Sequence, residues 1–291
     1  MGASRYATRG LHGPPAGDPV NRLLGTVEAP LLHVMTLNVR RPMPSLLSSP
    51  SDRWARRRPA LVSMLRRESP SILCAQEVLP GPAAEIAAAL GPSFARIGVG
   101  RRRGGRGEGC PVFFDRDRLE LLHHRQRALS DTPDVLGTRS WGNLVPRIVT
   151  VGAFRDRITG ARFAVVNTHL DPFSARSRMR GVEAIRSEVR GTGLPTLVLG
   201  DMNTGAESEA LRALRAGDLL TDTWTVAAER VTPAWGTYAG YRAPVRDGKR
   251  IDVILATSDI EVERVGIDAR TEDGIAPSDH LAVHAALEVP R

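Results

Sequence analysis

The sequence predicts an α/β protein built from two mixed β-sheets that pack face to face, with helices on the outside. Apolar runs of strand length outnumber segments with helical spacing, and the chain begins strand–helix–strand–helix before it becomes rich in strands. The strict alternation that a single parallel sheet requires is therefore not followed. No internal repeat or Pro/Gly linker divides the chain after residue 30, so we expect one domain over residues 31–291.

The expected elements follow in chain order. Apolar runs predict strands at residues 31–39, 72–76, 94–99, 111–114, 119–127, 148–155, 163–168, 196–199, 251–256, 260–268 and 281–287. Apolar residues at helical spacing predict helices at residues 52–67, 83–90, 175–189 and 208–214. Ser51 or Asp52 would cap the first helix, because a short side-chain oxygen at that position can accept a backbone N–H.

Composition describes a globular protein without a membrane span. Hydrophobic residues make up 42% of the 291 residues and charged residues 25%, which allows a sizeable core. No apolar run approaches the roughly 20 residues that cross a bilayer. Residues 1–30 lack the continuous apolar stretch of a secretory signal, and we expect a flexible tail there, or else a start site placed too far upstream. The sequence therefore predicts a cytoplasmic monomer with no membrane partner.

The chain is basic, with a formal charge of +8, and Lys249 is the only lysine among its 40 basic residues. A basic surface favours a polyanionic partner, such as nucleic acid or a phosphorylated small molecule. An arginine-rich composition that reflects biased codon usage is an equally good explanation. Net charge therefore informs about association and leaves the specific function open.

Polar side chains follow the apolar runs at the points where the predicted strands end. Asp201 and Asn203 end the run that begins at Leu197, and strand alternation aims both to the same side. A carboxylate and an amide so placed can hold a hard cation, a phosphate oxygen or an attacking water. Because similar polar residues end several other runs, the sequence predicts a single catalytic site.

Six short motifs occur in a fixed order along the chain. They are Thr36-Leu-Asn-Val-Arg40, Gln76-Glu77, Asn167-Thr-His-Leu-Asp171, Gly200-Asp-Met-Asn203, Arg250-Ile-Asp252 and Ser278-Asp-His280. Each motif alone is common by chance, but the ordered set, with each motif beside a predicted strand, resembles the endonuclease/exonuclease/phosphatase superfamily. That superfamily includes DNase I, apurinic endonucleases, inositol-polyphosphate 5-phosphatases, sphingomyelinases and deadenylases. The resemblance runs from about residue 31 to the C-terminus and implies a four-layer α/β sandwich.

The resemblance implies a phosphoesterase that depends on Mg²⁺ or Mn²⁺, and the chemistry of the residues agrees. Phosphate-ester hydrolysis needs a cation on the phosphoryl oxygens, an activated water and stabilisation of the leaving oxygen. Glu77 is the expected metal ligand, helped by Asn38, and Asp279 would contribute directly or through water. Asp201 would orient and deprotonate the attacking water, while Asn203 holds that water or a phosphoryl oxygen.

Two histidines complete the expected catalytic set. His280 would contact the phosphate, and Asp252 would position it through a carboxylate–imidazole hydrogen bond that favours the protonated ring. His169 is, by the same resemblance, a second phosphate-contacting or proton-donating histidine. Family members differ in which group transfers protons, so the division of labour between Asp201 and His280 stays open.

Four further residues are expected to bind substrate or support the site: Asn167, Arg40, Arg147 and Glu108. Arg40 could contact phosphate or brace the site, and bracing is favoured. Arg147 could pair with a site carboxylate. Glu108 resembles a Gly-Glu element of some bacterial family members.

Other arginines and two tryptophans are weaker candidates for substrate contact. The glycine-rich segment 98–109 carries four arginines, Arg101, Arg102, Arg103 and Arg106. It could grip phosphates or form a solvated surface loop. Trp141 and Trp235 could stack on a base at the rim of the site, although core packing is the commoner use of tryptophan.

Three functions are candidates. The first is a nuclease or phosphodiesterase, and the second is a phosphatase of a small phosphorylated metabolite. The third, of a different class, is a catalytically inactive module that binds a phosphate ligand, and the intact motifs give it no support. No segment resembles the DNA-wedging loops of apurinic endonucleases, and no apolar segment suggests lipid binding. The substrate stays open, because specificity depends on loops that vary around a fixed core.

Overall fold

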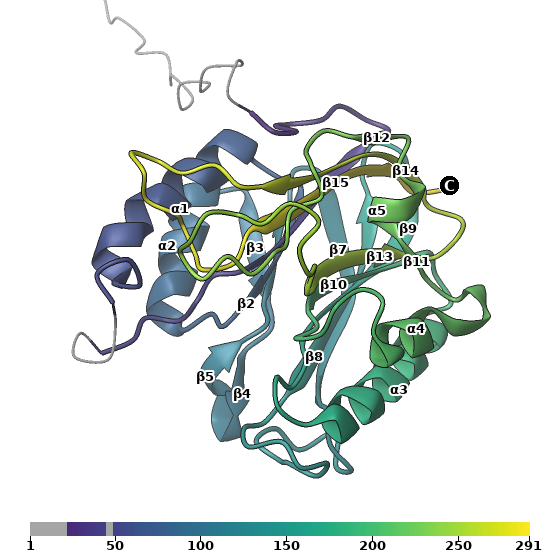
Figure 1. The fold of residues 1–291 in the computed structure, drawn as a ribbon. Coiled ribbons are helices and arrows are strands. Elements are labelled where there is room, and N and C mark those ends of the chain that lie inside the picture. Colours follow the sequence, from purple (N-terminus) through teal and green to yellow (C-terminus); the bar gives the residue numbers. More distant parts are fainter. Residues whose placement is uncertain (1–21, 45–48) are drawn as a thin grey trace, which may run out of the picture.

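The computed structural model describes residues 22–44 and 49–291, which form four layers in the order helix, sheet, sheet, helix. Figure 1 shows α1 (Trp54–Glu68) and α2 (Pro80–Leu90) outside one sheet, and α3 (Ala175–Thr192) and α4 (Glu209–Arg215) outside the other. The predicted four-layer sandwich, with two mixed sheets face to face, is confirmed.

The described residues form two large sheets and one small hairpin. The first sheet has the order β12 (Glu229–Arg230), β14 (Glu261–Asp268), β15 (Ala282–Glu288), β1 (Leu32–Asn38), β2 (Ile72–Gln76), β6 (Val112–Asp115) and β3 (Phe94–Ile97). The second has the order β11 (Thr221–Asp222), β13 (Asp252–Ala256), β10 (Thr196–Asp201), β9 (Arg162–His169), β8 (Ile148–Asp156) and β7 (Leu119–Ala128). Strands β4 (Gly100–Arg102) and β5 (Arg106–Gly109) pair separately. Both large sheets are mixed, since β1 runs parallel to β2 and antiparallel to β15, and β10 runs parallel to β9 and antiparallel to β13.

Side-chain alternation assigns each strand residue to one of three apolar layers. On β1, Leu32 and Val34 pack between the sheets, whereas Met35 and Leu37 pack under α1 and α2. The second sheet repeats this pattern, because its outer face packs under α3 and α4. Every polar residue on an inner face therefore points into the space between the two sheets.

All predicted strands and helices are present, with ends that shift by a few residues. Prediction missed β4, β5, β11, β12 and the one-turn helix α5 (Thr223–Val226), because elements of two to four residues carry no periodic signal. Helix α2 begins at Pro80, three residues earlier than predicted, because proline suits the first helical position. The predicted cap of α1 is wrong. Arg53 precedes this helix without a side-chain cap, and Asp52 binds Arg40 instead.

The segment before β1 is attached to the end of α1. The carboxylate of Glu68 accepts the backbone N–H groups of Leu23, Leu24 and Gly25 at 3.0–3.1 Å. Of the predicted tail, residues 1–21 lie outside the described residues, whereas Leu23, Leu24 and Gly25 are bound to Glu68. No helix among the described residues is long and apolar enough to cross a membrane.

Two buried histidines lie beside this attachment. His33 Nδ1 lies 2.7 Å from the carbonyl oxygen of Gly25, and its Nε2 lies 3.0 Å from Nδ1 of His284. Burial, with repulsion from His284, lowers the pKa of His33 to about 3, although Glu68 opposes this shift. Burial also lowers the pKa of His284, against the attraction of Glu68 and Asp268. Both rings are therefore neutral at neutral pH.

These shifts predict a loss of stability in mild acid. Below the ordinary histidine pKa of about 6.5 the unfolded chain binds protons that the native state excludes, so the neutral His33 ring should lower the unfolding free energy by roughly 2 kcal/mol between pH 7 and pH 5. His284 acts in the same direction. Urea titrations at both pH values measure this loss. The variant His33→Gln should show a smaller pH effect than His123→Gln, which replaces an exposed histidine. Equal pH effects in the two variants would contradict the assignment.

Candidate active site

Each central strand brings one polar inner-face residue to the same end of the sandwich. They are Asn38 on β1, Gln76 on β2, His169 on β9, Asp201 on β10 and Asp252 on β13. Directly below them, Thr36 on β1 and Asn167 on β9 are also polar and contact Gln76. Further along the strands the inner face is apolar; on β10, for example, Leu197 and Leu199 precede Asp201. Apolar packing thus holds the sheets together at one end, and polar groups meet at the other.

Asp201 lies at the centre of this polar end and is almost completely buried. Asn38 Nδ2 donates to Asp201 Oδ2 at 3.0 Å and to Glu77 Oε1 at 3.2 Å. The backbone N–H of Asn203 donates to Asp201 Oδ1 at 2.8 Å. The amide of Asn38 therefore joins the carboxylates of both sheets.

The glycine before Asp201 is required by its backbone. Gly200 has φ +145°, and a Cβ atom there would lie 2.0 Å from the carbonyl oxygen of Thr168 on the neighbouring strand. No side chain fits this position, because the oxygen belongs to the sheet backbone and cannot move aside. This close approach explains the glycine of the Gly-Asp-x-Asn motif.

Residues with a left-handed backbone conformation turn the chain at the strand ends. Arg40, Glu77 and Asn203 have φ values of 51°, 58° and 51°, which non-glycine residues seldom adopt. Such strain is common where a fold holds functional groups in place. Here it turns the chain directly after β1, β2 and β10.

His280 forms an ion pair with the carboxylate behind it. Its Nδ1 lies 2.9 Å from Asp252 Oδ2, and its Nε2 lies 3.8 Å from Asp201 Oδ2. Burial alone would lower the pKa of His280, but the charges of Asp252, Asp201 and Asp279 outweigh burial and raise the pKa to about 10. The ring is therefore an imidazolium at neutral pH.

Asp201 carries the opposite perturbation. Burial and the charge of Asp252, its register partner on β13, raise the pKa of Asp201 to about 7, against His280 and the hydrogen bond from Asn38. A carboxylate with this pKa can exchange a proton near neutral pH.

His169 differs from His280 in charge. Burial lowers the pKa of His169 well below its usual range, and the nearby charges of Arg147, Arg101 and His280 lower it further. Its Nε2 lies 3.4 Å from Asp201 Oδ2. Because the ring is neutral, this contact is not an ion pair. The predicted proton-donating role of His169 is therefore disfavoured, and a neutral hydrogen-bonding role fits better.

Arg40 braces the site from the side of β1. Its guanidinium pairs with Asp52 at 3.0 Å and lies 3.7 Å from Asp279 Oδ2. Burial raises the pKa of Asp279, while His280 and Arg40 oppose this shift and Glu77 adds to it.

The cavity at this polar end has a volume of about 490 Å³. Its lining residues are Arg40, Arg41, Glu77, Arg101, Glu108, Arg147, His169, Pro172, Phe173, Asp201, Asn203, Tyr238, Ile251, Asp279 and His280. Nine of the twelve predicted site residues line it. Of the other three, Asn38 and Asp252 lie directly behind it and bind Asp201 and His280.

Asn167 is the exception, and its predicted role in substrate binding is wrong. Its side chain is fully buried between the sheets. Asn167 Nδ2 donates to the carbonyl oxygens of Ala75 and Pro111, and its Oδ1 accepts from Gln76 Nε2 at 2.8 Å. With its amide engaged inside the protein, Asn167 links the sheets below the cavity.

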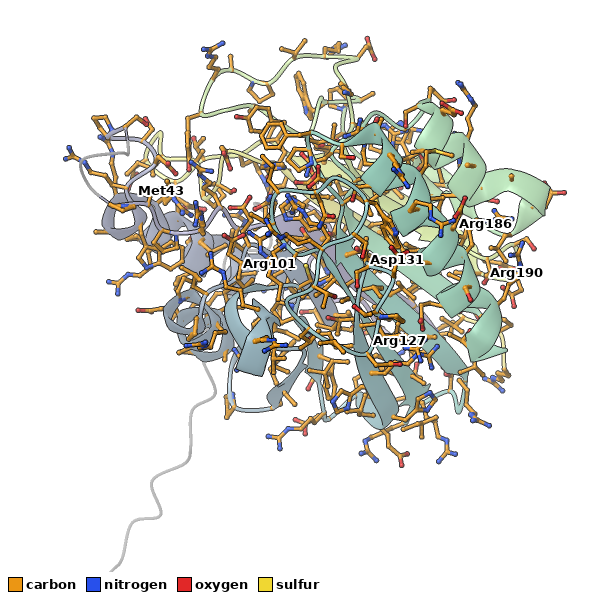
Figure 2. The ribbon with its side chains drawn as sticks, turned by 90° about the horizontal axis from the view of Figure 1, so that it is seen from below. Met43, Arg101, Arg127, Asp131, Arg186 and Arg190 are labelled. Carbon is orange, nitrogen blue, oxygen red and sulfur yellow. The ribbon has the colours of Figure 1, made fainter. Side chains whose placement is uncertain are left out.

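The arginine-rich segment is a hairpin, and its arginines point to different places. Arg101 pairs with Glu108 at 2.9 Å inside the cavity, and Arg41 pairs with the same carboxylate at 3.2 Å. Figure 2 labels Arg101 near the middle of the face seen from below, between Met43 and the α3 residues Arg186 and Arg190. The other three arginines of the segment, Arg102, Arg103 and Arg106, do not line the cavity. The four arginines therefore do not act together inside the cavity.

Arg147 lies on the same side of the cavity. Its Nε is 3.5 Å from Asp171 Oδ2, so the predicted pairing with a motif carboxylate is present. Sequence reasoning missed Arg41, whose only signal was its place directly after the first motif.

The two tryptophans do not contribute to the rim. Trp141 is buried and donates its ring N–H to Asp131, while Trp235 packs against the core between the sheets. The rim aromatics are Phe173 and Tyr238, which prediction missed.

A model of the endonuclease/exonuclease/phosphatase family matches residues 35–280. The chain belongs to this family. The solved structure of a family protein from Bacteroides thetaiotaomicron is similar, with a TM-score of 0.84 and 26% identity over 90% of this chain and 98% of that chain. A mannosyl-6-phosphatase of the same species gives a TM-score of 0.81 and 26% identity over 88% and 99%.

Two further relatives match with a lower TM-score or over a shorter part of the chain. The catalytic domain of human nocturnin shares the fold, with a TM-score of 0.66 and 18% identity over 90% of this chain and 94% of that chain. Protein angel of Drosophila melanogaster is 28% identical over 172 residues, which are 55% of this chain. The match covers 47% of angel, so this chain spans about half the length of that relative. Family members are phosphoric-ester hydrolases, and the chain belongs to a superfamily of phosphoesterases.

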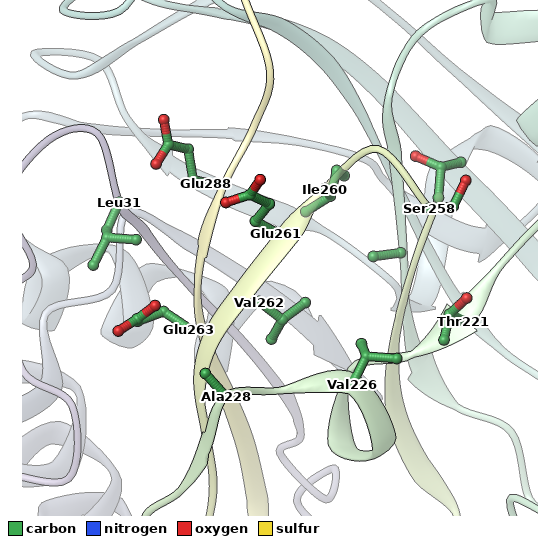
Figure 3. A pocket seen from close by; sticks show the side chains of 12 residues that line it. Leu31, Thr221, Val226, Ala228, Ser258, Ile260, Glu261, Val262, Glu263 and Glu288 are labelled. Carbon is green, nitrogen blue, oxygen red and sulfur yellow. The ribbon is translucent and has the colours of Figure 1, made fainter.

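A second cavity of about 450 Å³ lies at the opposite ends of β1 and β13 (Figure 3). Figure 3 shows the carboxylates of Glu261, Glu263 and Glu288 around it, and no arginine, lysine or histidine lines it. Its negative charge repels phosphate, so this cavity does not suit a phosphoester, whereas four arginines line the first cavity.

One buried arginine ties together chain segments beside the cavity. Arg57 of α1 is completely buried, and its guanidinium donates to backbone carbonyl oxygens of four residues. These are Val39 at 2.6 Å, Asp52 at 3.2 Å, Pro277 at 3.4 Å, and Arg40. Arg57 thus ties the segment after Asn38 to the segment before His280.

The variant Arg57→Met should lower the unfolding free energy by about 2 kcal/mol or more, because it leaves several buried carbonyl groups without donors. Chemical denaturation measures the loss. The control is Arg58→Met, which replaces a half-exposed side chain and should change stability by less than about 0.5 kcal/mol. Equal losses in the two variants would contradict the bracing role.

Proposed function

We propose that the protein is a divalent-metal-dependent phosphoesterase. The carrying observation is the pairing of an imidazolium, His280, with a carboxylate of raised pKa, Asp201, at 3.8 Å inside a cavity lined by arginines. Such a pair offers a proton acceptor and a phosphate-binding cation side by side.

The oxygen donors of the cavity fit a hard cation. Glu77 and Asp279 both line the cavity, and carboxylate oxygens are the ligands that Mg²⁺ and Mn²⁺ prefer. The Oδ1 of Asn38 accepts from the backbone N–H of Arg40 at 2.9 Å, and its second lone pair can bind a cation while Nδ2 still donates to Asp201. A bound cation would polarise a phosphoryl oxygen and lower the pKa of a water molecule.

A second group of donors is a weaker candidate for the metal. Single atoms of Asp201, Asp252 and His280 lie within 4.8 Å of one another, close enough to surround an ion. A metal-binding imidazole must be unprotonated, however, and the raised pKa of His280 keeps its proton. We therefore assign these three residues to catalysis and Glu77, Asp279 and Asn38 to the metal.

The catalytic residues then have distinct tasks. Asp201 orients the attacking water and accepts its proton, while His280 contacts the phosphoryl group and is held by Asp252. Asn203 Nδ2 donates to the carbonyl oxygen of Leu170 at 3.0 Å, and its remaining amide groups can hold the water or a phosphoryl oxygen. His169 contributes a neutral hydrogen-bonding group.

The ester class has two candidates. A nuclease or phosphodiesterase fits the four arginines that line the cavity, with nucleic acid as one candidate partner. A phosphatase of a small phosphorylated metabolite is favoured by the likeness to the mannosyl-6-phosphatase. An inactive binding module is disfavoured, because every predicted catalytic residue lies at or directly behind the cavity.

Hydrolysis should require a divalent cation. Excess EDTA should stop turnover of any phosphoester substrate, and Mg²⁺ or Mn²⁺ should restore it. The variant Glu77→Gln should raise the metal concentration that gives half-maximal rate, since it removes one anionic ligand. Glu85→Gln, a change at a half-exposed residue of α2, is the matched control. Full turnover in metal-free buffer would overturn the proposal.

The two perturbed groups predict a bell-shaped pH profile. Asp201 must be ionised and His280 protonated, so kcat/KM should rise as pH increases through about 7 and fall as it increases through about 10. A cation bound nearby favours the carboxylate, so added metal should move the acid limb to lower pH. His280→Gln should remove the alkaline limb and lower kcat by at least about 10²-fold. A profile without an alkaline limb in the unmodified protein would contradict the role of His280.

A further inference from the structure

The exposed aromatic side chains of the described residues lie at the catalytic cavity. Among the phenylalanines and tyrosines that the structure describes, only Phe173 and Tyr238 are exposed, at 77% and 57%. Both line the cavity. Aromatic rings carry a large apolar area that folding normally buries, so their placement at this one rim points to a ligand.

The cavity has one apolar side, which we name the apolar rim: Pro172, Phe173, Tyr238 and Ile251. Three hydrogen bonds link the segments that carry it. Ile251 N donates to Thr237 Oγ1 at 2.9 Å, Met202 N donates to the Ile251 carbonyl at 2.8 Å, and Asn203 Nδ2 donates to the Leu170 carbonyl at 3.0 Å. The rim residues therefore belong to neighbouring segments. Every other lining residue is charged or polar.

The apolar rim is attached to two residues of the proposed phosphoester site, Arg147 and His280. Asp171 Oδ1 accepts the backbone N–H of Phe173 at 3.0 Å, while its Oδ2 faces Arg147. The ring of Tyr238 lies edge-on to the ring of His280, with centroids 5.0 Å apart. A group bound on the rim would therefore lie next to a phosphoryl group held by His280.

We infer that the apolar rim binds the aromatic base of a nucleotide whose phosphoester is hydrolysed in the adjacent site. This inference rests on the proposed phosphoesterase function. A base presents a flat π face that stacks on phenylalanine or tyrosine. A sugar instead presents hydroxyl groups that need hydrogen-bond partners when buried, and on the rim only the Tyr238 hydroxyl offers one. The substrate class is thus nucleotide, either free or at the end of a strand.

A matched pair of substrates isolates the base. A nucleoside 5′-monophosphate and ribose 5-phosphate carry the same ester on the same pentose and differ in the base. A dinucleotide and its analogue with one base removed form the corresponding diester pair. The ratio of kcat/KM, base over no base, should be roughly five- to 150-fold, since stacking contributes about 1–3 kcal/mol per base. Hydrolysis of the monophosphate pair would indicate that free nucleotides are the substrates, and hydrolysis of the dinucleotide pair would indicate strand ends.

Substitutions at the apolar rim should change the ratio of kcat/KM between substrates with and without the base. Phe173→Ala and Phe173→Leu should bring it towards one, whereas Phe173→Tyr should keep it, because the stacking face remains. Ile158→Ala removes another exposed apolar side chain (65%) outside the cavity and should leave the ratio as in the unmodified protein. A ratio near one in the unmodified protein, or one insensitive to Phe173→Ala, would overturn the inference.

Ligand affinities measured by calorimetry test the apolar rim independently of the proposed phosphoesterase function. If metal restores no hydrolysis of any ester, the phosphoesterase proposal fails. The rim is then tested by the affinity of the unmodified protein and Phe173→Ala for the nucleoside monophosphate and for ribose 5-phosphate. Tighter binding of the nucleotide, lost in Phe173→Ala, supports the rim, and equal affinities in the unmodified protein refute it.

Discussion

The site depends on one hydrogen bond between the two sheets, from the amide of Asn38 at the end of β1 to Asp201 at the end of β10, at 3.0 Å. Taking a carboxylate out of water costs several kcal/mol unless polar partners replace the solvent. Asp201 finds these partners only where the ends of the sheets meet: the Asn38 amide, the Asn203 N–H and the charge of His280. Apolar packing further along the strands fixes that meeting point.

A polar layer below the cavity fixes the same spacing. Gln76 Nε2 donates to Asn167 Oδ1 across the sheets at 2.8 Å and lies 3.1 Å from Thr36 Oγ1. Buried amides are costly unless they are paired, so this layer stabilises only one separation and register of the sheets. Asn167 therefore shares a motif with His169 for a structural reason. Motif membership marks the site region, and burial decides which residues of a motif reach the cavity.

Much of the fold could be predicted from the sequence, because each main strand is an apolar run of ordinary length. The site was predictable as a set of residue types, yet the approach of Asn38 to Asp201 arises from sheet packing, which spacing along the chain does not encode. Arg101 and Arg102 illustrate the limit. They are adjacent and chemically identical, but only Arg101 points into the cavity, because the hairpin places neighbouring side chains on opposite faces. The sequence did not mark Phe173 as a site residue, since its exposure is a property of the folded chain.

The two histidines of the cavity, His280 and His169, show how neighbouring charges set the protonation state of a buried ring. His280 has Asp252 behind it at 2.9 Å and keeps its proton, whereas His169 lies near the guanidinium groups of Arg147 and Arg101 and loses it. Desolvation acts on both rings in the same direction, so the sign of the neighbouring charge decides the outcome. Asp201 consequently lies between one charged and one neutral imidazole. If both rings were charged, the pKa of Asp201 would fall and the carboxylate would lose its strength as a base. Neutral His169 therefore preserves a proton acceptor within reach of the imidazolium.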